Sequence, residues 1–558
     1  MSDLLNKASL VVIPSGYKED TVYSVVPSDG SGDLSFTRAS NGTRINSAGL
    51  VEVTPWNLTE KSNNFANWLG VNNVTITAND TTAPNGTTTA SKIVVGSGSP
   101  IRIFDFIGNP TQGVYTISVY AKAGTGDEII LYTTNAYVYA TYNLSNGTVT
   151  QGVGTASIEN AGNGWYRCIV TNTIAAGEIG QIIFSGNSTN EYVYLYGYQT
   201  NVGSTAKPYF PTTDRLNVPR LTYQNGGGGC PSLLLEKQST NEVQYSQELD
   251  NAYWFKYQGS ITANQGISPD GTQNADLWTT SGSQSVLYRT GFTCNVLSYF
   301  AKAVSLSSGS KFYIQVDGVG NAEWNQDGTL SSVSGGTATN GQNMGNGWFR
   351  FAYIVTSGNV ANYGLNGNTS TSTALFWGLQ NEAGSYPTSY IPTTSASATR
   401  VADACSKTGI SSLIGQTEGV IFTDFTINAL ANFGTPLSVN DGSTANYIWL
   451  TIFANGNLRA ELFNSSGVQA TITYSGAVVG GRYKMAFAYK TNDFAMYVNG
   501  SLVGIATSGT TFSGTTLSRI DNDITSPALY SLASQSINQS ALFKTRLTNA
   551  ELASLTTL

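Results

Sequence analysis

The sequence reads NAGNGWYR at residues 160–167 and NMGNGWFR at residues 343–350. Each stretch contains an Asn-Gly pair, which favours a tight hairpin turn because both central residues of that turn need positive φ. The two aromatic residues and the arginine that follow are typical of a strand. The copies start 183 residues apart, at 160 and 343. We therefore expect the same hairpin twice, inside a large unit that is present twice.

The similarity extends outward from this hairpin, in the same order on both sides. The matching pairs are Asn67-Trp68 with Tyr253-Trp254, Ile76–Asn79 with Ile261–Asn264, Pro84–Thr87 with Pro269–Thr272, Ser118–Ala123 with Ser298–Ala303, Leu195–Gln199 with Phe376–Gln380, and Pro211–Thr213 with Pro392–Thr394. The spacing stays at roughly 180 residues, whereas solenoid repeats run to roughly 20–50 residues. The pattern predicts a tandem domain duplication.

The duplicated units have the pattern of sheet proteins. Segments such as Tyr115–Ala121 and Glu191–Tyr196 alternate in polarity, and turn signals separate many short segments of this kind. Many short strands at such spacing predict a β-sandwich or a barrel. No stretch of useful length in either copy predicts a helix.

Five segments follow from this reading. Residues 57–215 and 237–403 are the duplicated domains, residues 216–236 are a glycine-rich linker, and residues 404–558 form a different domain. Residues 1–56 are too few to build a stable core alone. We expect them to act as an adaptor or anchor that packs on another chain or on the first large domain.

A short linking element occurs next to each domain boundary. It places an arginine beside an apolar residue, and its three copies are Thr43-Arg44-Ile45, Pro219-Arg220-Leu221 and Thr399-Arg400-Val401. We expect an extended strand that joins consecutive modules. In its sharper form, the prediction is that the arginine pairs with a carboxylate at the boundary.

The last domain contains a second kind of hairpin. Residues 482–489 and 494–503 alternate around a turn at Thr491–Asp493, and Asn499-Gly500 predicts another tight turn. Only Thr548–Leu555 has a helical pattern, with Thr548 or Asn549 able to cap its start.

Composition excludes several classes of partner. Charged residues make up 11% of the 558 residues, and the net charge is −7. Without a basic tract there is no electrostatic footprint for nucleic acid. The sequence contains no secretory signal and no run of about 18 apolar residues, so we expect no membrane insertion.

The sequence contains no histidine, which removes the Ser-His-Asp triad, Cys-His pairs and every histidine-ligated zinc site. A glycosidase needs only two carboxylates and stays possible. The nearest acidic group is Asp521-Asn522-Asp523, which we expect to be a solvated loop and not a calcium or catalytic site. We expect no enzyme activity, no cofactor and no metal.

The four cysteines are too far apart for a zinc site. Cys168, Cys230, Cys294 and Cys405 have none of the close spacings that metal sites use. We expect buried free thiols, with disulfides as the alternative.

Aromatic residues are the natural contacts for sugar rings. Trp165 and Trp348 recur after equivalent turns, which favours core packing for both. Tyr447 and Trp449 alternate with apolar residues and are our candidate carbohydrate-binding residues, should one face of their strand be exposed. The alternative for this pair is also ordinary core packing.

These motifs resemble known families. The Asn-Gly-Trp-Tyr/Phe-Arg strand, with the Ala-Lys-Ala and Gly-x-Gln strands, resembles jelly-roll carbohydrate-binding-module domains found in phage structural proteins. The C-terminal hairpin, residues 487–500, resembles the laminin-G or concanavalin A-like lectin fold. With residues 13–17 and 36–40 added, the chain resembles large virion appendage proteins of phages that infect Bacteroidetes.

The resemblance implies an all-β chain of two tandem jelly-roll β-sandwiches and a concanavalin A-like β-sandwich. It also implies a fibre or receptor-binding subunit on the virion exterior, assembled in the host cytoplasm. We expect a homotrimer that binds host-surface glycans and contacts other virion proteins through its N-terminal segment. The alternatives are a purely structural capsid-fibre, collar or tail component, and a polysaccharide depolymerase. No sugar-contacting residue or calcium site carries over, because no binding motif of these families is intact here.

Overall fold

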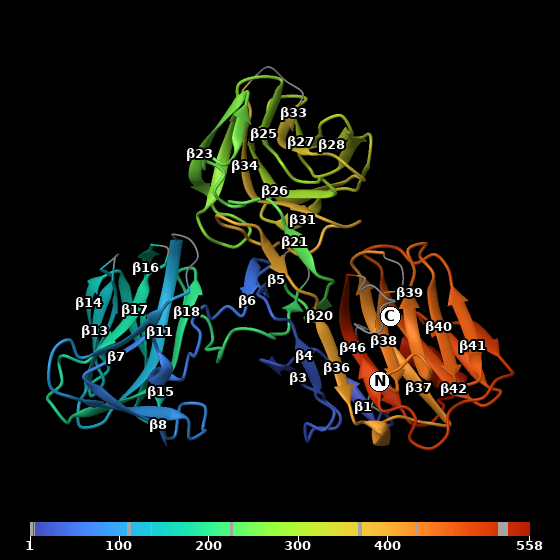
Figure 1. Cartoon of the computed structure of the whole chain (residues 1–558), viewed down its shortest axis with the longest axis horizontal. Coiled ribbons are helices and arrows are strands. Elements are labelled where there is room, and N and C mark those ends of the chain that lie inside the picture. Colours follow the sequence, from blue (N-terminus) through green and yellow to red (C-terminus); the bar gives the residue numbers. More distant parts are fainter. Residues whose placement is uncertain are drawn as a thin grey trace.

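A computed structural model describes residues 4, 6–108, 113–134, 137–175, 177–223, 227–366, 371–430, 434–522 and 534–558. It consists of three β-sandwiches (Figure 1), which confirms the predicted all-β fold class. The lobes lie around a central region that contains β5 (Gly42–Ile45), β6 (Val51–Thr54), β20 (Ser232–Leu235) and β21 (Ser239–Asn241).

The first sandwich has two sheets of six strands. One sheet has the order β14 (Thr148–Val153), β13 (Tyr139–Asn143), β12 (Glu128–Thr133), β17 (Ile179–Ile183), β10 (Arg102–Phe106) and β7 (Gly70–Asn72). The other has the order β15 (Thr155–Gly162), β16 (Trp165–Ile174), β11 (Gly113–Ala123), β18 (Tyr192–Val202), β9 (Ala90–Val95) and β8 (Val74–Thr81).

The second sandwich repeats this strand order. One sheet has the order β22 (Phe255–Tyr257), β25 (Gln284–Thr290), β33 (Val360–Asn366), β27 (Lys311–Val316), β28 (Gly320–Trp324) and β29 (Leu330–Val333). The other has β23 (Gly259–Gly266), β24 (Ala275–Thr280), β34 (Thr373–Glu382), β26 (Val296–Ser305) and β32 (Trp348–Ile354), with β30 (Thr337–Ala338) and β31 (Gln342–Gly345) both paired to β32. The short strand β21 pairs with β35 (Ala398–Arg400).

The duplicated hairpins have nearly identical backbones. The φ angles are 52° at Asn163 and 79° at Gly164 in the first copy, and 51° at Asn346 and 80° at Gly347 in the second. Both central residues take positive φ, as the Asn-Gly pair predicts for a tight turn.

Side-chain hydrogen bonds recur at matching positions as well. Asn57 Nδ2 donates to the carbonyl of Phe210 at 2.9 Å, and Asn241 Nδ2 donates to that of Ile391 at 2.9 Å. Both bonds fasten the first segment of a sandwich to its last. The two copies therefore share this hydrogen bond between their first and last segments as well as their strand order.

Alternation along each strand builds the sandwich cores, since successive side chains point to opposite faces. Cys168 on β16 and Phe351 on β32 occupy matching core positions, and both are fully buried. Cys294 and Cys405 are buried too, as expected for thiols that serve as small apolar groups. Cys230 differs from the prediction because it is exposed.

The C-terminal sandwich has two larger sheets. One has the order β19 (Leu221–Thr222), β20, β46 (Gln535–Phe543), β37 (Glu418–Ile427), β42 (Arg482–Lys490), β43 (Phe494–Val498) and β44 (Ser501–Ala506), with β1 (Leu10–Val12) also paired to β46. The other has β2 (Tyr17–Lys18), β3 (Thr21–Val22), β4 (Leu34–Thr37), β36 (Ala404–Thr408), β45 (Arg519–Asp521), β38 (Gly434–Asn440), β39 (Tyr447–Ile452), β40 (Leu458–Asn464) and β41 (Gly467–Tyr474).

Helical structure matches the sequence pattern. The helix α2 (Asn549–Thr556) begins after Thr548, whose side chain accepts a bond from the Glu551 N–H in a capping box. The other named helical elements are single 3₁₀ turns, η1 (Phe65–Asn67) and η2 (Ser411–Leu413).

We expect the N-terminal segment to pack on another chain or on the first large domain, but in the structure it packs chiefly on the C-terminal sandwich. Strand β1 pairs with β46, and β4 pairs with β36, so residues 10–37 complete both sheets of the C-terminal sandwich. The linker strand β20 pairs with β46 as well. The reason is that β46 and β36 have edges whose backbone groups need partners. The segment also contacts the first sandwich: Glu52 pairs with Lys207, Glu19 accepts from the Thr213 hydroxyl at 2.7 Å, and Trp56 Nε1 donates to the carbonyl of Pro208 at 2.8 Å.

Three arginines and two carboxylates meet where these segments converge. We call Arg38, Arg220, Arg400, Glu236 and Asp403 the arginine cluster. Their side chains are at most 3% exposed. The linking arginines Arg220 and Arg400 thus pair with carboxylates at the boundaries, as the sharper prediction stated.

The bonds of the cluster join three stretches of the chain that lie far apart in sequence. Arg38 Nη1 lies 2.9 Å from Asp403 Oδ1, and Arg220 bonds the other oxygen of the same carboxylate. Glu236 Oε2 accepts from Arg220 Nη1 at 2.7 Å and from Arg400 Nη1 at 2.9 Å. Because each carboxylate holds two guanidiniums, the N-terminal segment, the linker and the end of the second domain are tied together next to β36.

The third linking arginine forms a separate pair. Arg44 Nη2 lies 2.8 Å from Glu52 Oε2 across the hairpin of β5 and β6. Glu52 also pairs with Lys207, which brings the hairpin to the first sandwich. This confirms a carboxylate partner for all three linking arginines.

Removal of one shared guanidinium should destabilise the chain strongly. We expect Arg220→Ala to lower the free energy of unfolding by about 3–5 kcal/mol, because Glu236 and Asp403 then lose a partner while buried. Urea unfolding followed by tryptophan fluorescence measures the change. Lys490→Ala is the matched control: Lys490 pairs with Glu418 at 3.6 Å but is exposed, so we expect a cost below about 1 kcal/mol. Equal losses in both variants would contradict the role of the cluster.

Acid should weaken the cluster as well. Burial raises the pKa of Glu236. The Arg400 and Arg220 guanidiniums and the Ser389 hydroxyl lower it by a larger amount, so the pKa of Glu236 lies below the ordinary glutamate range. A depressed carboxyl pKa adds stability above the unfolded-state pKa, and this stability is lost as pH falls toward the folded pKa.

We therefore expect the free energy of unfolding to fall as pH drops below about 4.5, the ordinary range for a glutamate. Glu236→Gln should be less stable at neutral pH and should lose part of this pH dependence. Urea unfolding across the acid range measures both. A variant with the same pH slope as the unaltered chain would show that Glu236 does not carry the effect.

Candidate functional site

The sequence-based candidates Tyr447 and Trp449 lie on β39 in the nine-stranded sheet of the C-terminal sandwich. Ile448 and Leu450, between and beside them, belong to the buried core. Alternation therefore places Tyr447 and Trp449 on the opposite, outer face of this sheet. The structure brings the two rings together, with centroids 4.0 Å apart.

Both rings are nevertheless mostly buried. Tyr447 is 8% exposed and Trp449 is 7% exposed. The Tyr447 hydroxyl donates to Glu461 Oε1 at 2.9 Å, and its ring stacks on Phe463 at 5.2 Å. A sugar needs an open ring face for stacking, and little of either ring is available here. Carbohydrate binding by this pair stays a prediction, and the burial argues against it.

A polar group lies on neighbouring strands of the same sheet. Asp521 accepts from Asn440 Nδ2 at 2.8 Å and from Arg519 Nη2 at 2.6 Å. Burial raises the pKa of Asp521, while its bonds to Arg519 and Asn440 oppose the shift. The carboxylate is thus held in place by its neighbours and is not free for acid–base chemistry.

This arrangement corrects the expected solvated loop at residues 521–523. Asp521 ends strand β45 and is 2% exposed, and Asn522 is also buried. Asn522 Nδ2 donates to the carbonyl of Pro436 at 2.9 Å and to the Ser540 hydroxyl at 2.6 Å. In the sequence, a polar pair of this kind is typical of an exposed loop. In the structure, its hydrogen bonds offset the cost of removing both side chains from water. Asp523 lies outside the described residues.

The recurring tryptophans are structural, as predicted. Trp165 and Trp348 are almost fully buried, and each indole N–H donates to a backbone carbonyl at 3.1 Å, of Thr82 and Ile267 respectively. The indole nitrogen is satisfied within the protein, so neither ring is a candidate sugar platform.

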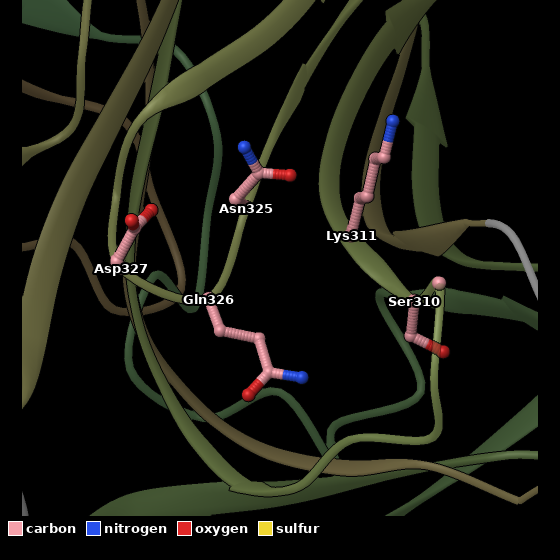
Figure 2. A pocket seen from close by; sticks show the side chains of 6 residues that line it. Ser310, Lys311, Asn325, Gln326 and Asp327 are labelled. Atoms are coloured by element: carbon pink, nitrogen blue, oxygen red, sulfur yellow. The ribbon is translucent and has the colours of Figure 1, made fainter.

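The second sandwich has a shallow polar cavity of about 350 Å³. It lies between Ser310 and Lys311 on one side and the turn Asn325–Asp327 on the other (Figure 2). Asp327 accepts from the hydroxyl and the N–H of Thr329, and Lys311 Nζ donates to the Ser331 hydroxyl at 2.6 Å. These bonds shape a turn, so the cavity offers no convergent set of free groups.

Within the described ranges, no three histidine, cysteine, aspartate or glutamate side chains come close enough together to hold a metal ion. None of the helices in these ranges has the length and apolar character needed to cross a membrane.

The sequence reading missed a group of tyrosines on the first sandwich. Tyr120, Tyr194, Tyr196 and Tyr209 gather on the outer face of the sheet that contains β11 and β18. Tyr196 and Tyr209 have ring centroids 5.3 Å apart. The signal was available in the aligned repeats, because Tyr120 and Tyr196 stand where the second copy has Phe300 and Trp377.

Comparison with known proteins gives similarities of fold only. No protein-family model matches the chain, and no curated protein matches it. Similar solved structures include the CBM40 domain of Ruminococcus gnavus IT-sialidase bound to α2,3-sialyllactose, with 16% identity over 26% of this chain and 84% of that chain and a TM-score of 0.23.

Two further examples come from other organisms. The NanB sialidase of Streptococcus pneumoniae is 17% identical over 27% of this chain and 26% of that chain, with a TM-score of 0.23. Domains LG4-5 of the mouse laminin α1 chain are 15% identical over 47% of this chain and 86% of that chain, with a TM-score of 0.18. Because these TM-scores are low, the fold is assigned from strand order and strand pairing. The similar structures indicate no ligand for this chain.

The bond between Tyr447 and Glu461 should contribute to stability. Tyr447→Phe removes the donor to a buried carboxylate, and we expect a loss of roughly 1–3 kcal/mol in the free energy of unfolding. Urea unfolding measures this change. Tyr139→Phe is the control and should change stability little, because Tyr139 is an exposed tyrosine on β13 of the first sandwich. A neutral Tyr447→Phe would mean that Glu461 is satisfied without this hydroxyl.

Proposed function

We propose that this chain is a non-enzymatic phage virion protein, a fibre or appendage subunit whose β-sandwiches bind glycans on the host surface. The observation that carries the proposal is the set of ion pairs at the centre of the chain: the arginine cluster ties the N-terminal segment and the linker to the end of the second sandwich, and Glu52 with Lys207 adds the first sandwich. A rigid set of sandwiches suits a protein that presents binding surfaces at a set distance from a particle. The absence of histidine from the sequence supports a role without catalysis.

The proposal includes the partners and the location implied by the family resemblance. The chain is a homotrimer on the particle exterior, assembled in the host cytoplasm, with neither nucleic acid nor membrane as a partner. Other virion proteins bind its N-terminal segment. Because β1 and β4 are used within the chain itself, this contact relies on exposed residues such as Tyr23 and Val25, which are 38% and 47% exposed.

A purely structural component of the capsid, collar or tail is the second candidate. The burial of Tyr447 and Trp449 favours it, because the C-terminal sandwich then lacks the sugar platform that the sequence suggested. Both candidates share the rigid architecture and differ only in glycan binding.

Binding of purified host-surface polysaccharide to the full chain separates the two candidates. We expect saturable binding by calorimetry, with no release of reducing ends from the polysaccharide. Deletion of residues 404–558 is unsuitable as a test, because β1 and β20 would lose their partner β46.

Glycan binding together with particle labelling by an antibody against the chain is the result that supports the proposal. The absence of binding at millimolar sugar, on a chain that labels the particle, would favour the purely structural candidate. Release of reducing ends would instead show a depolymerase and overturn the non-enzymatic assignment.

A further inference from the structure

The two copies of the repeated sandwich differ in what covers one of their outer sheet faces. In the second copy, the outer face of the sheet that contains β26 and β34 is covered by the hairpin of β5 and β6. Val51 of the hairpin lies in one apolar cluster with residues of that face. The cluster comprises Val51, Ala275, Phe300, Met344, Trp348, Leu375, Trp377 and Tyr390.

Two hydrogen bonds to backbone carbonyls hold the hairpin on this face. The Val51 N–H donates to the carbonyl of Pro269 at 2.9 Å, and the Thr43 hydroxyl donates to the carbonyl of Tyr390 at 2.5 Å. Leu50 lies against Gly271, where an added Cβ would come within 2.8 Å of Leu50 Cδ1. The face of the second copy is therefore an occupied intramolecular interface.

The equivalent face of the first copy has no such cover in the part of the chain that the structure describes. Its apolar cluster contains only residues of the first sandwich. The cluster comprises Ala83, Ala90, Trp165 and Tyr196, with Tyr120, Ala161, Tyr194 and Tyr209 packed against it. Tyr120, Tyr194 and Tyr209 are each partly exposed, whereas Tyr196 is buried and supports them from below.

The amino-acid changes between the copies follow the difference in cover. Phe300, Leu375 and Trp377 of the covered face correspond to tyrosines in the first copy, and Leu277 corresponds to Lys92. The matched tyrosines are Tyr120, Tyr194 and Tyr196. The rings are kept or gained, and each position acquires a hydroxyl.

The rings are close enough to act as one surface. The centroids of Tyr120 and Tyr196 are 6.1 Å apart, and those of Tyr120 and Tyr209 are 6.3 Å apart. Lys92 Nζ lies 4.1 Å from the ring centroid of the adjacent Tyr192. The surface therefore combines flat apolar rings with hydrogen-bonding groups at their edges.

The hydroxyls of Tyr196 and Tyr209 already bond Asn85 at 2.9 Å and Ser62 at 2.8 Å. An apolar hairpin tip would still suit this surface poorly, because it would bury the Tyr120 hydroxyl, for which the described residues supply no hydrogen-bond partner. A sugar ring presents C–H groups to an aromatic face and hydroxyls at its rim. Tyrosine matches both, since its ring is apolar and its hydroxyl donates and accepts hydrogen bonds. The chemistry thus selects a carbohydrate over a second copy of the hairpin.

We propose that the tyrosine face, in which the partly exposed rings of Tyr120, Tyr194 and Tyr209 gather around the buried Tyr196, is a carbohydrate-binding site of the first sandwich. This inference rests on the proposed function and gives it a location. In the second sandwich, the β5–β6 hairpin of the N-terminal segment covers the equivalent face.

The test uses the full chain on an oligosaccharide array of neutral hexoses, N-acetylhexosamines, uronic acids and sialic acids. The best glycan is then titrated by calorimetry against Tyr120→Ala and Tyr194→Ala. We expect each variant to bind about ten-fold more weakly or worse, because a stacked ring is lost. Tyr139→Ala is the matched control: it is a tyrosine 41% exposed on the other sheet of the same sandwich, and binding should be unchanged.

Circular dichroism confirms folding of each variant, and Tyr194→Phe and Lys92→Ala serve as milder changes should an alanine variant unfold. Binding by the unaltered chain that all variants retain would overturn the site while the proposed function stands. No binding of any glycan by the unaltered chain would overturn both. A change of oligomeric state in Tyr194→Ala on sedimentation would show a protein interface and would also overturn the site.

Discussion

The charge pairing inside the arginine cluster is the constraint on which the rest of the chain depends. Three guanidiniums and two carboxylates are removed from water together, and such charges are tolerated only when each keeps close partners. Arg38, Glu236 and Asp403 lie far apart in sequence. The cluster can therefore form only when the N-terminal segment, the linker and the end of the second domain are all in place.

Much of this architecture could be predicted from the sequence. The Asn-Gly turns and the alternation of their strands gave both hairpins, and repetition next to each boundary singled out Arg220 and Arg400. Their partners were harder to find, because Glu236 and Asp403 have no matching pattern of their own. The pairing of β1 with β46 could not be predicted, since Leu10–Val12 is a short apolar run that fits many neighbours.

The candidate site shows the same limit. Alternation assigns Tyr447 and Trp449 to the outer face of their sheet, and the structure agrees. Alternation does not show which other residues pack on that face, and the burial of Tyr447 and Trp449 depends on those neighbours. Within the duplicated domains the comparison is sharper: Asn57 and Asn241 keep the same internal bond, while Tyr120 and Phe300 have diverged. The bonds that fasten each sandwich are thus kept, while side chains on the outer face differ between the copies.

The position of β46 has a consequence for synthesis on the ribosome. Strand β1 precedes both repeated sandwiches in the chain, yet its partner β46 begins only at Gln535. Domains generally fold in order as they emerge, so both repeated sandwiches can be complete while β1 still lacks β46 and β4 still lacks β36. The last sandwich closes only after Gln535–Phe543 has been synthesised, and a chain cut before this strand leaves β1 without the strand that it pairs with.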